Sequence, residues 1–82
     1  MALQCTLVNS VGVETLRKTL GARVRQLRRD AGISLENFAD TCGFARSYMS
    51  RIERGTANLS LDAIERLAGA FGITVGELFK DL

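Results

Sequence analysis

Apolar residues recur at spacings of three and four along most of the chain, which is the period of a helix that buries one face. The first stripe begins at Val13 and ends at Ala31, and Gly32 follows it directly. A glycine in that place is typical of a helix C-terminus. The pattern therefore predicts an amphipathic helix over residues 13–31. Its apolar positions are Val13, Leu16, Leu20, Val24, Leu27 and Ala31.

Two short helices are predicted within residues 34–55. Ser34 is suited to cap the first one, and Gly43 breaks the pattern after it. The second is expected over about Arg46–Arg54 and stops at Gly55. Each is too short to be stable alone, so both must pack on a scaffold.

Two more helices are predicted in the C-terminal third. Ser60 is placed to cap a helix whose apolar stripe ends at Phe71, and Gly72 stops it. Thr74 and Glu77 match the capping box of a last short helix.

We therefore predict an all-α fold, with one compact five-helix domain over residues 13–82. A chain of 82 residues fits a single domain. Such a chain buries only about 60% of the surface that it exposes when unfolded, so dimerisation would add to a marginal core. Residues 1–12 are expected to form a loosely ordered arm, with packing on the domain or on a partner as the alternative.

The composition argues against an enzyme and against a cofactor or metal site. The chain has no His, and Cys5 and Cys42 lack the spacing of metal ligands. Two cysteines also make a poor disulfide framework, which favours a reducing cytoplasm. No stretch approaches the roughly 20 apolar residues of a membrane span, and the N-terminus lacks the basic start of a signal peptide.

Charge is distributed unevenly, although the net charge is only +2. Residues 13–31 hold six basic and two acidic side chains, whereas residues 56–82 hold two basic and four acidic ones. This gradient fits either ordinary solvated helix faces or a molecule with one end that meets phosphates. The same two interpretations apply to Arg17, Lys18 and Arg25 of the first helix.

The most informative segment is SLENFADTCGFARSYMSRIERG, residues 34–55. Ala39 is small where two helices would cross, and Gly43 stands where a tight turn needs a positive φ. Met49 then points back into the core. A small residue, a glycine and an apolar residue at these offsets are typical of a helix-turn-helix.

The exposed side of the second helix of this segment carries groups suited to DNA. Its members are Arg46, Ser47, Ser50, Arg51 and Arg54, with Tyr48 at the flank. Arg bonds a guanine edge at two points, Ser bonds several bases or a phosphate, and Tyr reaches a phosphate or a sugar. The alternative is a solvated helix surface.

The sequence resembles the helix-turn-helix family of lambda-type phage repressors and xenobiotic-response-element regulators. The resemblance rests on LGARVRQLRRDAGISLENFA, SYMSRIERG and NLSLDAIERLAGAFGITVGELF. Within that family, the run ARSYMSRIERGTANLSL looks most like restriction-modification controller proteins. The resemblance implies a homodimeric regulator of transcription that binds double-stranded DNA. The same fold also occurs in antitoxins, which bind a toxin, and in adaptors, which bind the transcription machinery. A toxin or RNA polymerase is therefore an alternative further partner of this chain.

The resemblance also assigns residues. It places Arg46, Ser47, Ser50 and Arg51 in the groove and gives Thr56 and Asn58 phosphate contacts. It pairs Arg28 with Glu53, and it places the dimer interface at the last helix and the turn before it. So many apolar side chains at the edge of a small core also favour an interface. The residues expected there are Phe71, Ile73, Val75, Leu78 and Phe79.

Two positions depart from the family pattern. Many members have Gln where this chain has Leu35, and that Gln contacts a phosphate and braces the next helix. The usual Ser, Thr or Asp cap of the groove helix is Ala45 here, which has no side-chain oxygen to accept a capping hydrogen bond.

Overall fold

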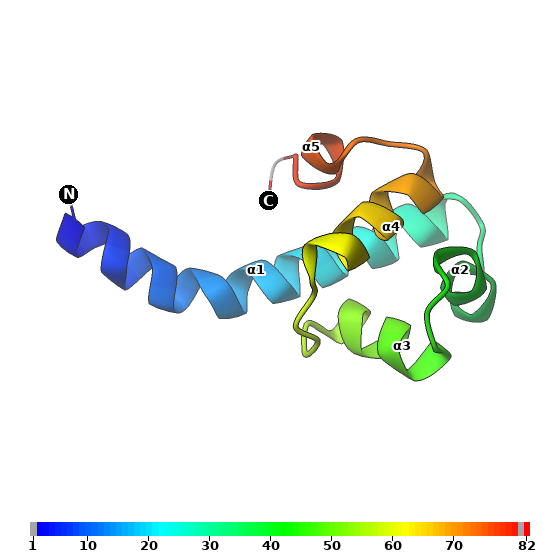
Figure 1. Ribbon diagram of the computed structural model, residues 1–82, viewed down its shortest axis with the longest axis horizontal. Helices are drawn as coiled ribbons and strands as arrows, with labels where there is room; N and C mark the ends of the chain where they lie inside the picture. Colours follow the sequence, from blue (N-terminus) through cyan, green and yellow to red (C-terminus); the bar gives the residue numbers. More distant parts are fainter. Residues whose placement is uncertain (1, 81) are drawn as a thin grey trace.

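The computed structural model describes the backbone of residues 2–80 and 82 and the side chains of residues 15–80 and 82. Within that part the secondary structure consists of five helices. They are α1 (Ala2–Asp30), α2 (Leu35–Cys42), α3 (Arg46–Arg54), α4 (Leu61–Phe71) and α5 (Val75–Leu78) (Figure 1). The prediction of an all-α, five-helix fold is confirmed.

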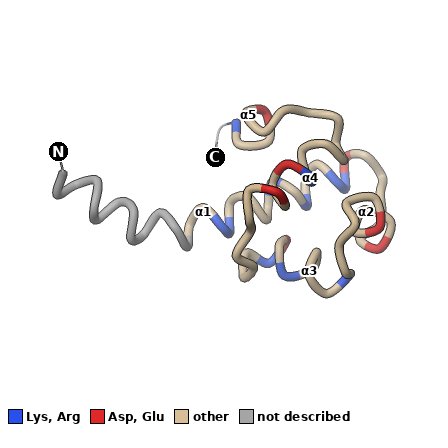
Figure 2. Tube along the Cα trace, in the orientation of Figure 1, with Lys and Arg blue, Asp and Glu red and all other residues tan. Residues whose placement is uncertain are grey.

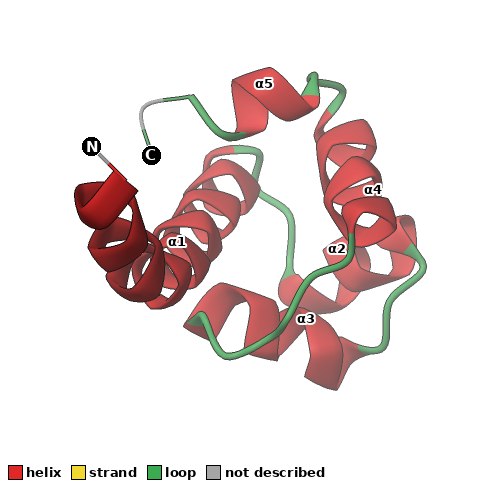
Figure 3. Ribbon diagram, turned by 60° about the vertical axis from the view of Figure 1, so that its left-hand side comes forward, coloured by secondary structure: helices red, strands yellow, loops and turns green. Residues whose placement is uncertain are grey.

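The long helix α1 is the scaffold on which the others pack. It contacts α3 and α4, while α2 contacts α3 and α4, and α5 contacts α4. Figures 1 and 3 both show α3 and α5 on opposite sides of the bundle, with α1 and α4 between them. None of the described helices is long and apolar enough to cross a membrane.

The core lies where these helices meet. Phe38 of α2 is fully buried and stacks on the ring of Phe71 of α4, with the centroids 4.4 Å apart. Burial of such apolar side chains is the main favourable contribution to folding. The buried cluster consists of Leu20, Val24, Phe38, Ala39, Cys42, Met49, Ile52, Ala57, Leu67, Ala68 and Leu78.

Local capping sets the helix boundaries where the sequence predicted them. The Ser34 hydroxyl accepts a hydrogen bond from the Asn37 N–H at 3.1 Å, and Ser60 does the same for Ala63. Thr74 and Glu77 form both hydrogen bonds of the capping box. These contacts satisfy backbone donors that a helix N-terminus leaves unpaired.

Gly21 allows α1 and α3 to approach closely. It is buried in the middle of α1, and a Cβ added there would lie against the Ile52 carbonyl oxygen and 2.8 Å from that of Glu53. Only a glycine fits this distance without a shift of backbone. The last turn of α3 therefore rests directly on the backbone of α1.

The predicted first helix differs from α1 in two respects. The helix of the structure begins at Ala2 rather than near Val13. Two positions placed on the buried stripe by their spacing are exposed: Leu16, which is 45% exposed at the edge of a hollow shared with Ile64 and Phe79, and Ala31, which follows the end of α1. The prediction of an arm over residues 1–12 concerns residues whose side chains lie outside the described part, and it stays a prediction.

Candidate nucleic-acid interface

The turn between α2 and α3 is built from backbone contacts around one glycine. Gly43 has a φ of 76°, in the left-handed region that favours glycine, and its N–H points to the carbonyls of Ala39 and Asp40. The Phe44 N–H donates to the Ala39 carbonyl at 2.8 Å. The chain therefore leaves α2 in a fixed direction and enters α3 at Arg46, three residues after Gly43, so the turn sets the angle between the two helices.

Helix α3 is held by its apolar side and presents its polar side to solvent. Met49 and Ile52 are almost completely buried beneath it. The exposed face, called the α3 face below, comprises Arg46, Ser47, Ser50, Arg51 and Arg54. Ser50 is the half-buried member, and the other four are exposed. Figure 2 shows the basic residues along α3 and the described part of α1.

Tyr48 borders the α3 face and is partly packed. Its ring meets the edge of Phe44 with the centroids 5.0 Å apart and the planes at 89°. Phe44 in turn packs against the core. An edge-to-face contact of this kind stabilises this arrangement of the two rings, so Tyr48 is packed on one side while it borders the α3 face.

Arg46 has a partner that the sequence did not reveal. Its Nε lies 3.3 Å from Oε1 of Glu36 in the first turn of α2, and both side chains are mostly exposed. Glu36 also stands in the first turn of α2, where the helix dipole favours an acidic side chain. The pair arises because the turn brings the N-terminal ends of α2 and α3 together, which spacing within one helix cannot indicate.

No side-chain hydrogen bond caps the N-terminus of α3. Ala45 occupies the capping position in an extended conformation. It has no side-chain oxygen, so it cannot accept the capping hydrogen bond, as the sequence predicts. Leu35, the other departure from the family pattern, is half-buried and packs against the core. Neither residue supplies a polar contact between α2 and the start of α3. The ion pair of Glu36 with Arg46 is the polar side-chain contact that joins these two places.

The loop after α3 is held in place by a buried residue at its centre. Ala57 is fully buried, whereas its neighbours Thr56 and Asn58 are exposed. The Thr56 N–H and hydroxyl both donate to the Arg51 carbonyl, at 3.0 and 3.3 Å. The loop is thereby tied to the last turn of α3, and it displays Thr56 and Asn58 beside it.

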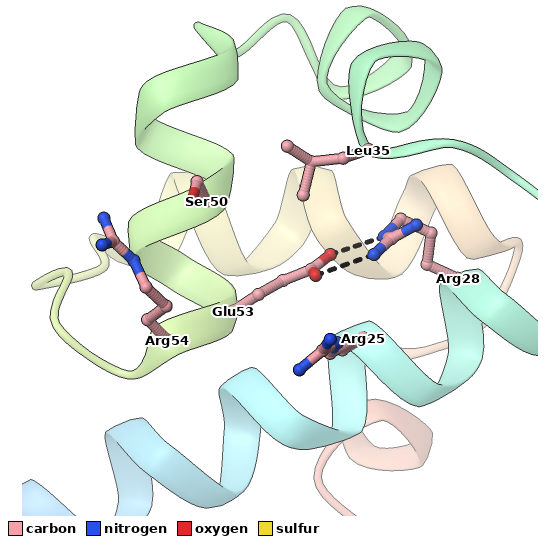
Figure 4. Close-up of a pocket in the computed structure, with 6 residues that line it drawn as sticks. All are labelled: Arg25, Arg28, Leu35, Ser50, Glu53 and Arg54. Carbon is pink, nitrogen blue, oxygen red and sulfur yellow. Dashed lines mark hydrogen bonds and ion pairs between the residues drawn. The ribbon is translucent and has the colours of Figure 1, made fainter.

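Arg28 and Glu53 form an ion pair across the α1–α3 contact (Figure 4). Arg28 donates from Nε to Oε2 at 2.7 Å and from Nη2 to Oε1 at 3.0 Å. Its Nη1 donates to the Ile33 carbonyl at 2.9 Å. The side chains are only 12% and 7% exposed, and the hydrogen bonds to Glu53 raise the pKa of Arg28 above its ordinary value.

The residues predicted for a dimer interface do not share one environment. Val75 is 40% exposed, and Ile73 and Phe79 are half-buried. The ring of Phe71 stacks on Phe38 within the same chain. Leu78 is fully buried within its own chain, so it belongs to the core and cannot form an interface surface. The spacing of α5 did not reveal this because four residues span only one turn.

The chain belongs to the helix-turn-helix domain family, whose model matches residues 19–80. Its sequence is 42% identical to that of the control protein C.BamHI from Bacillus amyloliquefaciens, over 77% of this chain and 79% of that one.

Two solved structures have a similar fold. The restriction-modification controller protein C.AhdI from Aeromonas hydrophila superposes with a TM-score of 0.76 at 42% identity, over 79% of this chain and 98% of that one. SinR, solved in complex with DNA, has a TM-score of 0.67 at 35% identity, over 72% and 95% of the two chains.

Proposed function

We propose that this protein is a sequence-specific DNA-binding regulator of transcription, which binds a roughly palindromic operator as a homodimer with α3 of each subunit in the major groove. The observation that carries the proposal is the α3 face. It is a row of arginine and serine side chains on a helix whose other side is buried and whose last turn rests on α1. A helix held in this way presents its side chains in fixed positions, as base recognition requires.

Within this function each side chain has a role. Arg46 lies at the start of α3, where a groove helix usually reaches base edges, and its planar fork matches a guanine at two points. Ser47, Ser50 and Arg51 read or brace neighbouring positions, and the packed Tyr48 holds the DNA backbone. Thr56 and Asn58 contact phosphates, since they are exposed at the end of α3.

The relatives support the narrower proposal of a restriction-modification controller. C.AhdI bears that description, C.BamHI is a control protein, and SinR was solved with DNA. We therefore propose a cytoplasmic protein that works on DNA without a cofactor and without catalysis. A two-fold dimer would place its two α3 helices about one helical turn apart, roughly 10 base pairs between half-site centres.

Selection of bound DNA from a random pool, followed by gel shifts over a range of salt concentrations, tests the proposal. We expect a two-fold symmetric sequence to be enriched, and its affinity to fall steeply with salt as phosphate contacts release counterions. A pool that stays random, with no slope above that of nonspecific binding, would contradict the proposal and favour an adaptor that binds only protein.

A further inference from the structure

A side chain of α1, that of Arg23, reaches across to α5. Its Nη2 donates to the Glu77 carbonyl at 3.1 Å, and its Nε donates to the Leu78 carbonyl at 3.4 Å. These carbonyls stand at the end of α5, where a helix leaves backbone acceptors without partners of its own and a basic side chain can bind them. The half-buried Arg23 therefore ties the end of α5 to α1.

Arg23 and Gly21 lie on opposite sides of the same turn of α1. Two residues of this separation are about 200° apart around a helix and about 3 Å apart along it. On the Gly21 side, the last turn of α3 rests on the backbone of α1. On the Arg23 side, α1 holds α5, and Figures 1 and 3 show α3 and α5 on opposite sides of the bundle. One turn of α1 thus contacts both the helix proposed to enter DNA and the helix predicted to join two subunits.

The contacts that hold α5 are few, because the helix is only four residues long. It packs on α4 and buries one side chain, that of Leu78, completely. A helix of one turn that is anchored by one side chain can still tilt about it, so a further contact at its end determines how it lies. Val75, which is 40% exposed, and the half-buried Phe79 change direction with it. The hydrogen bonds of Arg23 therefore orient the side chains predicted for the dimer interface.

We propose that Arg23 is a positioning residue for operator recognition, which fixes α5 relative to α1 and so determines the half-site spacing that the dimer accepts. The inference rests on the proposed function, because it requires a homodimer formed around α5 on a two-fold operator. Two helices presented to one face of DNA must match it in distance and in rotation. One base pair inserted between the half-sites adds about 3.4 Å and about 35° of rotation, which a rigid dimer cannot follow.

The test measures how strongly each protein discriminates between spacings. Wild type and Arg23→Met are compared on the selected operator and on the same operator with one base pair inserted between its half-sites. Methionine keeps an apolar stem and removes the donors of arginine. We expect the insertion to weaken binding by wild type about tenfold or more, because both half-sites can no longer be engaged together, and binding by Arg23→Met by less than about threefold. Affinity for DNA with a single half-site should be the same for both proteins, since the α3 face is unchanged.

The ratio of the two affinities separates positioning from a loss of stability. An unfolded fraction lowers both affinities of one protein by the same factor, so it cancels in the ratio. Arg29→Met is the matched control, because it removes an exposed arginine from the last turn of the same helix and should keep the wild-type ratio. If circular dichroism shows that Arg23→Met does not fold, Arg23→Lys replaces it. Lysine keeps the charge but lacks the planar fork that reaches two carbonyls, so its ratio should fall to about a third of that of wild type or lower.

The wild-type measurements keep the two proposals apart. If wild type selects no DNA sequence, or binds one half-site as tightly as the whole operator, the proposed function fails and this inference fails with it. If wild type discriminates between spacings and the folded Arg23 variant has the same ratio, only the role of Arg23 is wrong. An equal fall of the ratio in Arg29→Met would also overturn that role, because the effect would then come from charge on α1 and not from the contact with α5.

Discussion

Arg28 and Glu53 are joined by two hydrogen bonds that tie the end of α1 to the end of α3. Both side chains are nearly buried, and Arg28 also holds the Ile33 carbonyl in the turn that leads to α2. A single guanidinium group thus connects the scaffold, the turn and the helix proposed to enter DNA. The pair therefore bridges α1 and α3, and loss of either partner would leave a nearly buried charge without a counter-charge.

Removal of one partner should therefore be costly. In Glu53→Gln the charge of Arg28 would stay nearly buried without a counter-charge, and such losses cost about 3–5 kcal/mol. We expect the melting temperature, measured by circular dichroism, to fall by more than about 10 °C in a domain of this size.

Glu36→Gln is the matched control for this prediction. It removes the same group from the exposed pair with Arg46, and exposed pairs contribute little. Its melting temperature should stay within a few degrees of wild type. A Glu53→Gln protein that also melts within a degree or two of wild type would show that the nearly buried pair is dispensable.

The close approach of α1 and α3 gives a second prediction. Gly21→Ala places a Cβ against the backbone of Ile52 and Glu53, and such overpacking typically costs about 1–3 kcal/mol or more. Gly69→Ala, in α4, meets no atom within 4 Å and should stabilise the helix by about 0.5–1 kcal/mol. Urea denaturation measures both. Two variants that shift the midpoint in the same direction would contradict the packing of α3 on Gly21.

Cys42 gives a pH dependence with a definite sign. Burial raises the pKa of its thiol to about 11 from an ordinary value of 9.0, so the folded state favours the neutral thiol. This stability is complete below pH 9 and is lost as the pH rises toward 11, by up to about 3 kcal/mol. The difference in unfolding free energy between wild type and Cys42→Ala should therefore shrink over that range. A constant difference would mean that the thiol titrates normally.

The dimer prediction rests on the apolar groups around α5 that remain accessible. We expect wild type to sediment as a dimer at tens of micromolar, and Val75→Glu to be monomeric, because a charge would be buried in the interface. Leu61→Glu is the control: Leu61 is 81% exposed, but it lies at the start of α4, outside the predicted interface. Monomeric wild type, or an equal effect of the two substitutions, would contradict the interface.

The parts of this fold that local chemistry determines could be predicted from the sequence. The caps at Ser34 and Ser60 and the glycine turn at Gly43 depend on neighbours within a few residues, so spacing alone located them. The exposed side of α3 followed from its period in the same way.

The Arg28–Glu53 pair joins two helices and was predicted through the family resemblance, and the structure confirms it. Other features that depend on how helices meet could not be predicted from spacing. The Arg46–Glu36 contact, the burial of Leu78 and the need for a glycine at Gly21 each involve two elements. Arg23 is a similar case, because it donates from α1 to the carbonyls of Glu77 and Leu78 and so holds α5 in place. Nothing in the spacing of one helix indicates such partners.

The most direct test of the central claim compares Arg46→Ala with wild type on the selected operator, on operators changed at single positions and on unrelated DNA. If Arg46 reads a base, its loss should cost about 1–3 kcal/mol on the operator and abolish the preference at one position in each half-site, with little change on unrelated DNA. If Arg46→Ala instead weakens binding to all of these sequences in equal proportion, Arg46 contacts only the backbone, and the account of α3 as the base-reading helix led by Arg46 is contradicted.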